Sequence, residues 1–179
     1  AIVTRSLLPE YNHWVIIYAI AELKKIGLIL RVTIVGDGTL THDLRNLSVK
    51  LGVSELIIFK GRIHNHDLPS LLSENEIYIS TPITEGASSS LMEAMAIGLF
   101  PIVTHLPGNM SFIKHEQNGL LVDVGSVESL VEAIINYSKL NSEKFLEVTT
   151  QNRNWINENG NREKNMQIFL AHYLTKMKV

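Results

Sequence analysis

The chain lacks cysteine altogether across its 179 residues. This absence excludes a disulfide framework and a metal site built on thiolates, because both depend on cysteine sulfur. It is compatible with a reducing compartment, and we expect a cytoplasmic protein. The sequence also lacks an initiator methionine and opens directly on Ala1, which indicates a piece of a longer protein.

An excess of one charge and long apolar runs are missing as well. The formal net charge is -2, so no basic field favours nonspecific binding to nucleic acid or to an anionic membrane. No uncharged apolar stretch approaches the roughly 18 residues of a transmembrane helix, and the N-terminus lacks the basic region of a signal peptide. We therefore predict no nucleic-acid partner and no transmembrane segment.

The chain is instead rich in apolar residues, which make up 45% of it and suffice for one sizeable core. Short β-branched runs alternate with segments of helical pattern. Parallel strands need crossover connections, so repeated βα units predict an α/β fold with a mostly parallel sheet of about six strands and helices on both faces. The predicted strands span residues 1–5, 30–36, 56–61, 76–81, 100–105 and 119–124, and the predicted helices span 12–26, 41–51, 66–74, 89–97 and 127–140.

Ligands of such sheets bind at the carboxyl ends of the strands, where helix N-termini present free N–H groups. The loop "VGDGTLTHDL" follows the second predicted strand, and its Gly36 and Gly38 supply two of the three glycines of a dinucleotide fingerprint. Thr41 occupies the third position. The alternative is a tight turn in which Thr41 caps the next helix.

Other polar clusters carry weaker hypotheses. His64, His66 and Asp67 are competent metal ligands, but they precede a helix that Asp67 can cap, and no partner cluster is evident. We therefore predict no metal site. Ser89 lacks the G-x-S-x-G elbow of a serine nucleophile, and no Ser-His-Asp triad is predicted.

Two glutamates flank three serines in "ITEGASSSLMEAMAIG". Ser90 and Glu93 fit the S-x-x-E capping box, in which the carboxylate merely satisfies a backbone N–H. A cap at Ser88 instead gives a longer helix and makes Glu93 an interior residue that needs donors, such as the hydroxyls of a polar ligand. The pattern alone leaves both interpretations open.

The stretch "EGASSSLMEAMAIGLFPIVT" resembles the E-x7-E motif of the retaining family-4 glycosyltransferases, with seven residues between Glu85 and Glu93. The segments before and after it resemble the same family, over about residues 1–140. The resemblance implies the Rossmann-like, C-terminal donor-binding half of a GT-B enzyme. We expect a domain at 1–140 and a helical tail at 141–179 that packs on a missing N-terminal domain, through which a glycan or lipid-linked acceptor and the inner membrane face would be reached.

The resemblance also implies roles for individual residues. Glu85 would address hydroxyls of the transferred sugar, Arg5 the phosphates, and Glu93 the ribose. The remaining expected donor-binding residues are Ala87, Ser88 and Ser89 for the diphosphate, Ile63 for the base, Gly36 in the glycine-rich turn and Tyr11. The donor would be a UDP- or GDP-linked sugar, bound without a metal or other cofactor.

One departure from the family pattern bears on this expectation. Tyr11 stands where the family often has a lysine, so one phosphate cation is missing and the Tyr11 hydroxyl is expected to point toward the diphosphate. A GT-B sugar-nucleotide epimerase and a noncatalytic nucleotide- or phosphate-binding module are the alternatives. The chain alone is expected to bind donor and to transfer little or nothing.

Overall fold

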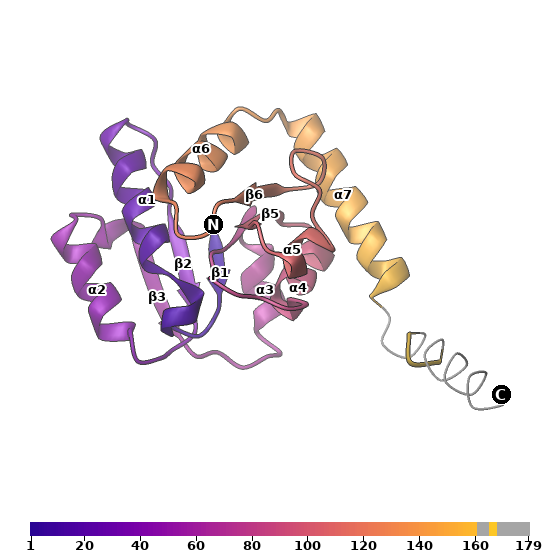
Figure 1. The fold of residues 1–179 in the computed structure, drawn as a ribbon, viewed down its shortest axis with the longest axis horizontal. Helices are drawn as coiled ribbons and strands as arrows, with labels where there is room; N and C mark the ends of the chain where they lie inside the picture. Colours follow the sequence, from indigo (N-terminus) through magenta and orange to yellow (C-terminus); the bar gives the residue numbers. More distant parts are fainter. Residues whose placement is uncertain (161–164, 168–179) are drawn as a thin grey trace.

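The computed structural model describes residues 1–160 and 165–167. Its centre is one parallel sheet with the strand order β3-β2-β1-β4-β5-β6 (Figure 1). This confirms the predicted α/β class and the six strands. The strands are β1 Ile2–Thr4, β2 Val32–Val35, β3 Ile57–Gly61, β4 Ile77–Ser80, β5 Phe100–Thr104 and β6 Leu120–Val122.

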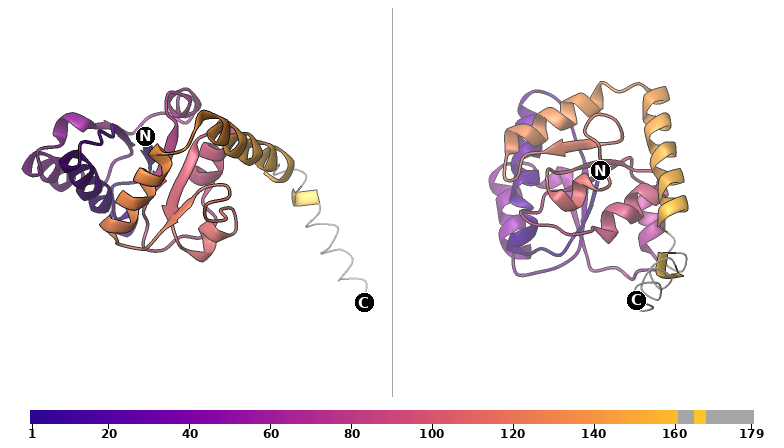
Figure 2. Two further views of the ribbon diagram at one scale, coloured as in Figure 1. Left: turned by 90° about the horizontal axis from the view of Figure 1, so that it is seen from above. Right: turned by 45° about the vertical axis from the view of Figure 1, so that its right-hand side comes forward.

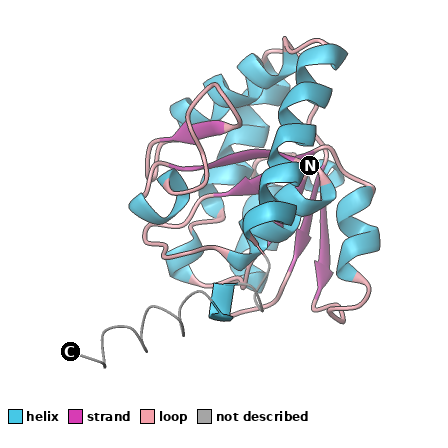
Figure 3. Ribbon diagram, turned by 90° about the vertical axis from the view of Figure 1, so that its right-hand side faces the viewer, coloured by secondary structure: helices cyan, strands magenta, loops and turns pink. Residues whose placement is uncertain are grey.

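Helices cover both faces of the sheet, as Figure 3 shows. One hydrophobic cluster joins the sheet to α1, α2 and α6, and a second joins it to α3, α4 and the end of α7. Burial on both faces explains why the strands are almost wholly apolar. The helices are α1 Trp14–Lys25, α2 Thr41–Lys50, α3 Leu68–Ser73, α4 Ser89–Ile97, α5 Pro107–Met110, α6 Val127–Ser138 and α7 Ser142–Asn159, with short 3-10 turns η1 Pro9–Tyr11 and η2 Ser54–Leu56.

The strand order reverses between β1 and β4, which lie side by side at the centre. In an open α/β sheet this reversal opens a crevice at the carboxyl ends of the strands. The loops that follow β1 and β4 therefore carry the residues best placed to meet a ligand.

The loop after β2 differs from the prediction at its helix start. Thr41 is the first residue of α2 rather than its cap, and Leu40 at the cap position makes no side-chain bond. The Thr41 hydroxyl instead donates to the Asp37 carboxylate at 2.7 Å or the Gly38 carbonyl at 2.8 Å. The Asp37 carboxylate also accepts the Gly38 N–H at 2.8 Å, so the turn is closed by Asp37 and Thr41 together.

Helix α7 packs along α4 and β5 (Figure 2). Arg153 donates to the Ile97 carbonyl at the end of α4 at 2.6 Å, and Asn152 exchanges hydrogen bonds with Asn118. The first part of the predicted tail is thus α7, whereas residues 161–164 and 168–179 of that tail lie outside the described residues. Within the described part of the chain, no helix is both long and apolar enough to cross a membrane.

Candidate functional site

The N-terminus of α4 forms one wall of the site. Ser88 is its cap, with the side-chain oxygen accepting the Leu91 N–H at 3.3 Å. The capping box at Ser90 is therefore absent, and Glu93 lies inside the helix, one turn from the cap. Ser90 faces β1, where its hydroxyl lies 3.4 Å from the Thr4 carbonyl.

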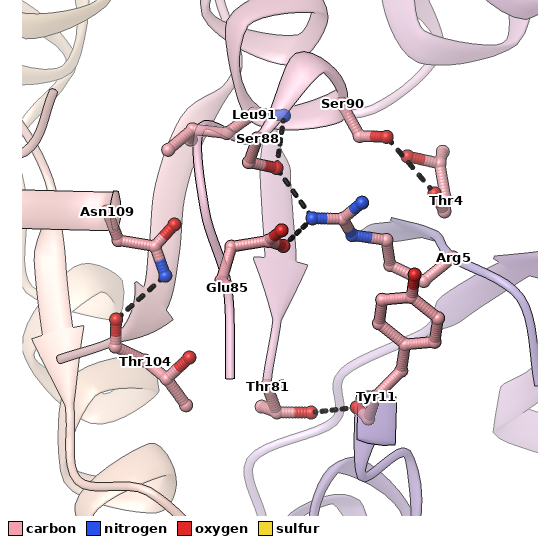
Figure 4. A network of polar contacts seen from close by, with 10 residues as sticks. All are labelled: Thr4, Arg5, Tyr11, Thr81, Glu85, Ser88, Ser90, Leu91, Thr104 and Asn109. Atoms are coloured by element: carbon pink, nitrogen blue, oxygen red, sulfur yellow. Dashed lines mark hydrogen bonds and ion pairs between the residues drawn. The ribbon is translucent and has the colours of Figure 1, made fainter. Parts of the chain in front are cut away.

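Arg5, directly after β1, reaches across to this helix. Its guanidinium donates to the Ser88 hydroxyl oxygen at 2.7 Å and forms an ion pair with Glu85 (Figure 4). Each side chain of the Arg5–Glu85 pair is 13% exposed. Because the pair is largely shielded from water, its attraction is stronger than that of a surface salt bridge.

Tyr11 lies on another side of Arg5. The Arg5 guanidinium carbon is 5.1 Å from the centre of the Tyr11 ring, a cation–π distance. The contact of Tyr11 with Arg5 is thus made by the aromatic ring.

A cleft of about 570 Å³ opens beside Arg5, between the carboxyl ends of the strands and helices α3 and α4. Three predicted donor-binding residues, Gly36, Ile63 and Glu93, line it together with Arg5. Gly36 has φ +133°, and a side chain there would collide with the Arg5 carbonyl, so the two loops approach through a glycine. Partial burial raises the pKa of Glu93, while the nearby Arg5 opposes the rise.

The other predicted residues lie next to the cleft rather than in its lining. Glu85 and Ser88 are joined to it through Arg5, whereas Ala87 and Ser89 are exposed at the start of α4. The loop that carries Glu85 is backed by α5, because Gly108 packs directly against the Gly86 carbonyl.

The histidine cluster after β3 does not assemble a metal site. The His64 and His66 rings stack with centroids 5.5 Å apart, and both side chains are exposed. No group of three or more potential metal ligands occurs within residues 1–160 and 165–167. Asp67 occupies the cap position of α3 without a side-chain cap bond.

His13 is a site residue that the sequence analysis missed. It is fully buried at the start of α1, and its ring centre lies 6.3 Å from that of Tyr11. Burial first, and the positive charge of Arg5 second, lower the pKa of His13 from 6.5 to about 4. A neutral histidine therefore lies behind the aromatic ring, so no second cation repels Arg5. A lone histidine between Asn12 and Trp14 gave no sequence signal for this burial.

Acid should destabilise the fold through His13. The unfolded chain binds a proton near pH 6.5 and the folded chain only near 4, so stability is complete above about 6.5 and falls as the pH drops toward 4. We expect the His13 contribution to lower the free energy of unfolding by about 2 kcal/mol between pH 7 and pH 5.

Urea unfolding of the protein and of His13→Gln at both pH values measures this contribution. In His13→Gln, most of the fall in the free energy of unfolding between pH 7 and pH 5 should disappear. In His42→Gln, a substitution of an exposed histidine, the fall should remain. An unchanged pH dependence in His13→Gln would contradict the lowered pKa.

The assembled geometry combines a fixed guanidinium, a helix N-terminus and two glutamates around a cleft. Helix N-termini and guanidinium groups both favour anions, and phosphate oxygens match the planar guanidinium fork. The sequence itself matches the family profile described as glycosyl transferases group 1 over residues 1–162. The chain belongs to the glycosyl transferase group 1 family.

Individual members of the family are similar in sequence. The chain is 27% identical over 120 residues to an Escherichia coli UDP-Gal:alpha-D-GlcNAc-diphosphoundecaprenol alpha-1,3-galactosyltransferase, a match covering 66% of this chain and 30% of that protein. It is 36% identical over 125 residues to the GtfA subunit of a Limosilactobacillus reuteri UDP-N-acetylglucosamine–peptide N-acetylglucosaminyltransferase, covering 68% of this chain and 24% of that protein. The matched part thus spans less than half the length of these relatives.

Solved glycosyltransferase structures share the fold. The Anabaena protein HepE, solved in complex with UDP, superposes with a TM-score of 0.84 at 21% identity, over 98% of this chain and 48% of that chain. The C-terminal domain of a Francisella tularensis group 1 glycosyl transferase, LpcC, has a TM-score of 0.78 at 20% identity over 90% of this chain and 86% of that domain. The Rossmann-like architecture of one half of a GT-B glycosyltransferase is therefore confirmed.

Proposed function

We propose that this chain is the donor-binding half of a retaining hexosyltransferase that moves a sugar from a UDP- or GDP-linked donor to a glycan or lipid-linked acceptor. The observation that carries the proposal is the contact of Arg5 with Glu85 and Ser88 at the N-terminus of α4. This arrangement puts a cation, a helix N-terminus and a carboxylate at the edge of one cleft, which supports the proposal.

The cleft divides into regions that suit the parts of such a donor. Ile63 and the apolar side chains of α3 and α4 line the part suited to a base. Glu93 would accept hydrogen bonds from the ribose hydroxyls. Arg5 and the backbone N–H groups of Ala87, Ser88 and Ser89 would receive the diphosphate, and Glu85 the hydroxyls of the sugar.

Charge development explains how this arrangement would promote transfer. Cleavage of a sugar–phosphate bond builds negative charge on the departing diphosphate. A guanidinium and helix N–H groups already fixed at that place stabilise the charge without reorganising. In this proposal the protein supplies the donors that neutralise the leaving group. The acceptor would be held by a part of the protein outside this chain.

The similar proteins support a nucleotide-sugar donor. HepE was solved with UDP-glucose, and the Escherichia coli relative is a galactosyltransferase that uses UDP-Gal. Tyr11 in the place of the family lysine favours a noncatalytic nucleotide-binding module as the second candidate. Assays of UDP-, GDP- and ADP-sugar consumption by the full-length protein, with and without acceptors, separate the two, because a module consumes none.

Nucleotide binding should depend on Glu93. We expect UDP or GDP to bind without added divalent metal, and Glu93→Ala to weaken binding by about 1 to 3 kcal/mol through lost hydrogen bonds to a charged acceptor. Titration calorimetry in the presence of a chelator measures both effects. Glu143→Ala, on the first turn of α7, is the matched control and should bind as the unchanged protein does. Equal affinity of Glu93→Ala and the unchanged protein would count against a ribose contact.

A further inference from the structure

We propose that Tyr11 is a positioning residue that holds the Arg5 guanidinium at the diphosphate position through the face of its ring rather than through its hydroxyl. The inference rests on the proposed function, which it deepens. It concerns how the site works with a tyrosine where a second phosphate cation is expected.

The first step is the contact between the Arg5 guanidinium and the Tyr11 ring. A cation over an aromatic face is attracted by the ring, and the 5.1 Å separation of the Arg5 guanidinium carbon from the Tyr11 ring centre is within the effective range. The N–H groups of the same guanidinium donate to Ser88 and pair with Glu85, so the ring contact does not prevent them from forming hydrogen bonds. Stacking and anion binding are therefore compatible at the same side chain.

The second step is the rigidity of the ring's support. Tyr11 ends the turn η1, and the next residue, Asn12, is buried with a left-handed φ of 54°. The Thr81 hydroxyl lies 3.3 Å from the Tyr11 carbonyl (Figure 4). It lies equally close to the Asn12 carbonyl. The Ile83 N–H also donates to the Glu10 carbonyl at 2.9 Å. The turn is thus tied to the same loop that presents Glu85.

The third step is what donor binding would change. A bound diphosphate competes with Glu85 for the Arg5 edge, so the ion pair is exchanged for a phosphate contact. The Arg5 Nε is buried and has no hydrogen-bond partner among the described residues, so it gives no alternative anchor. The Tyr11 ring contact is an interaction of the guanidinium that need not change, and it helps to keep Arg5 in place during the exchange. Neutral His13 behind the ring adds no opposing charge.

Nuclear magnetic resonance of the Arg5 Nε–H group tests the positioning without any nucleotide. Tyr11→Phe keeps the ring face and removes the hydroxyl, whereas Tyr11→Leu removes the face. We expect Tyr11→Phe to retain a slowly exchanging, ordered Arg5 signal and Tyr11→Leu to exchange faster with solvent. Similar Arg5 signals in all three proteins, or equal loss in both variants, would overturn the proposal.

Binding of UDP and of uridine supplies the second measurement. Uridine lacks the diphosphate, so a general disturbance of the fold weakens both ligands, whereas a misplaced Arg5 weakens UDP alone. We expect Tyr11→Leu to lose about tenfold in UDP affinity, with uridine unchanged and with Tyr11→Phe close to the unchanged protein. Equal weakening of both ligands would contradict the role of Tyr11. Failure of the unchanged protein to bind UDP would contradict the proposed function. The resonance of the Arg5 Nε–H group would still test the contact between Arg5 and the Tyr11 ring, because it needs no nucleotide.

Discussion

Replacement of Arg5 by alanine in the full-length protein should lower kcat/KM by about two orders of magnitude or more. Arg5 lines the cleft and contacts the cap of α4, and removal of one preorganised donor at a developing negative charge costs about this much. Steady-state kinetics with a donor that the protein demonstrably uses measures the effect. Arg5→Lys should recover only part of it, because an ammonium keeps the charge and loses the planar fork.

Arg45→Ala is the matched control for this experiment. Arg45 also lies over an aromatic ring, with its guanidinium carbon 4.7 Å from the Phe59 ring centre, but it lies on α2 and does not line the cleft. It should leave kcat/KM nearly unchanged. Near-normal turnover by Arg5→Ala would remove the phosphate role assigned to Arg5 and with it the main support for the proposed function.

Glu85→Gln should separate binding from turnover. The Glu85 carboxylate forms an ion pair with Arg5, so its neutral replacement would leave Arg5 more available to a diphosphate. We expect UDP to bind severalfold more tightly. We also expect kcat to fall about a hundredfold, because an interaction with the sugar that strengthens in the transition state is lost.

Calorimetry with UDP and initial rates with the sugar donor give the two quantities for Glu85→Gln. Glu10→Gln is the control, since it makes the same chemical change in the neighbouring turn η1, whose Glu10 carboxylate forms no ion pair within the described residues. Weaker UDP binding together with an unchanged kcat would show that Glu85 only supports the fold of its loop.

The sequence predicted the elements of the fold well because alternating βα units leave few topologies. The buried strands and the helix at 89–97 follow from local apolar patterns that survive in the structure. The choice between Ser88 and Ser90 as the cap could not be made, because both serines satisfy the local rule. The structure shows Ser88 as the cap, and its hydroxyl also accepts a hydrogen bond from Arg5, which is 83 positions away in the sequence.

The contacts of Tyr11 and His13 could not be predicted from the sequence either. Their spacing shows that both belong to the segment after β1, but not that one ring faces Arg5 and the other is fully buried behind it. Thr41 was misplaced for the opposite reason. Its local hydrogen bonds to Asp37 and Gly38 compete with helix capping. A threonine that caps the helix and one that closes the preceding turn look the same in the sequence.

The position of β1 at the centre of the sheet has a consequence for folding. Strands β1 to β3 can pair once the chain has reached residue 61, which places Arg5, directly after β1, in the first half of the sheet. Glu85 and Ser88 join only when β4 closes against β1, a contact between distant segments with a large loop-closure cost. A partly folded chain therefore has no complete anion site. In the proposed function, a nucleotide that binds at this site would not guide the early steps and would stabilise only the finished sheet, by mass action.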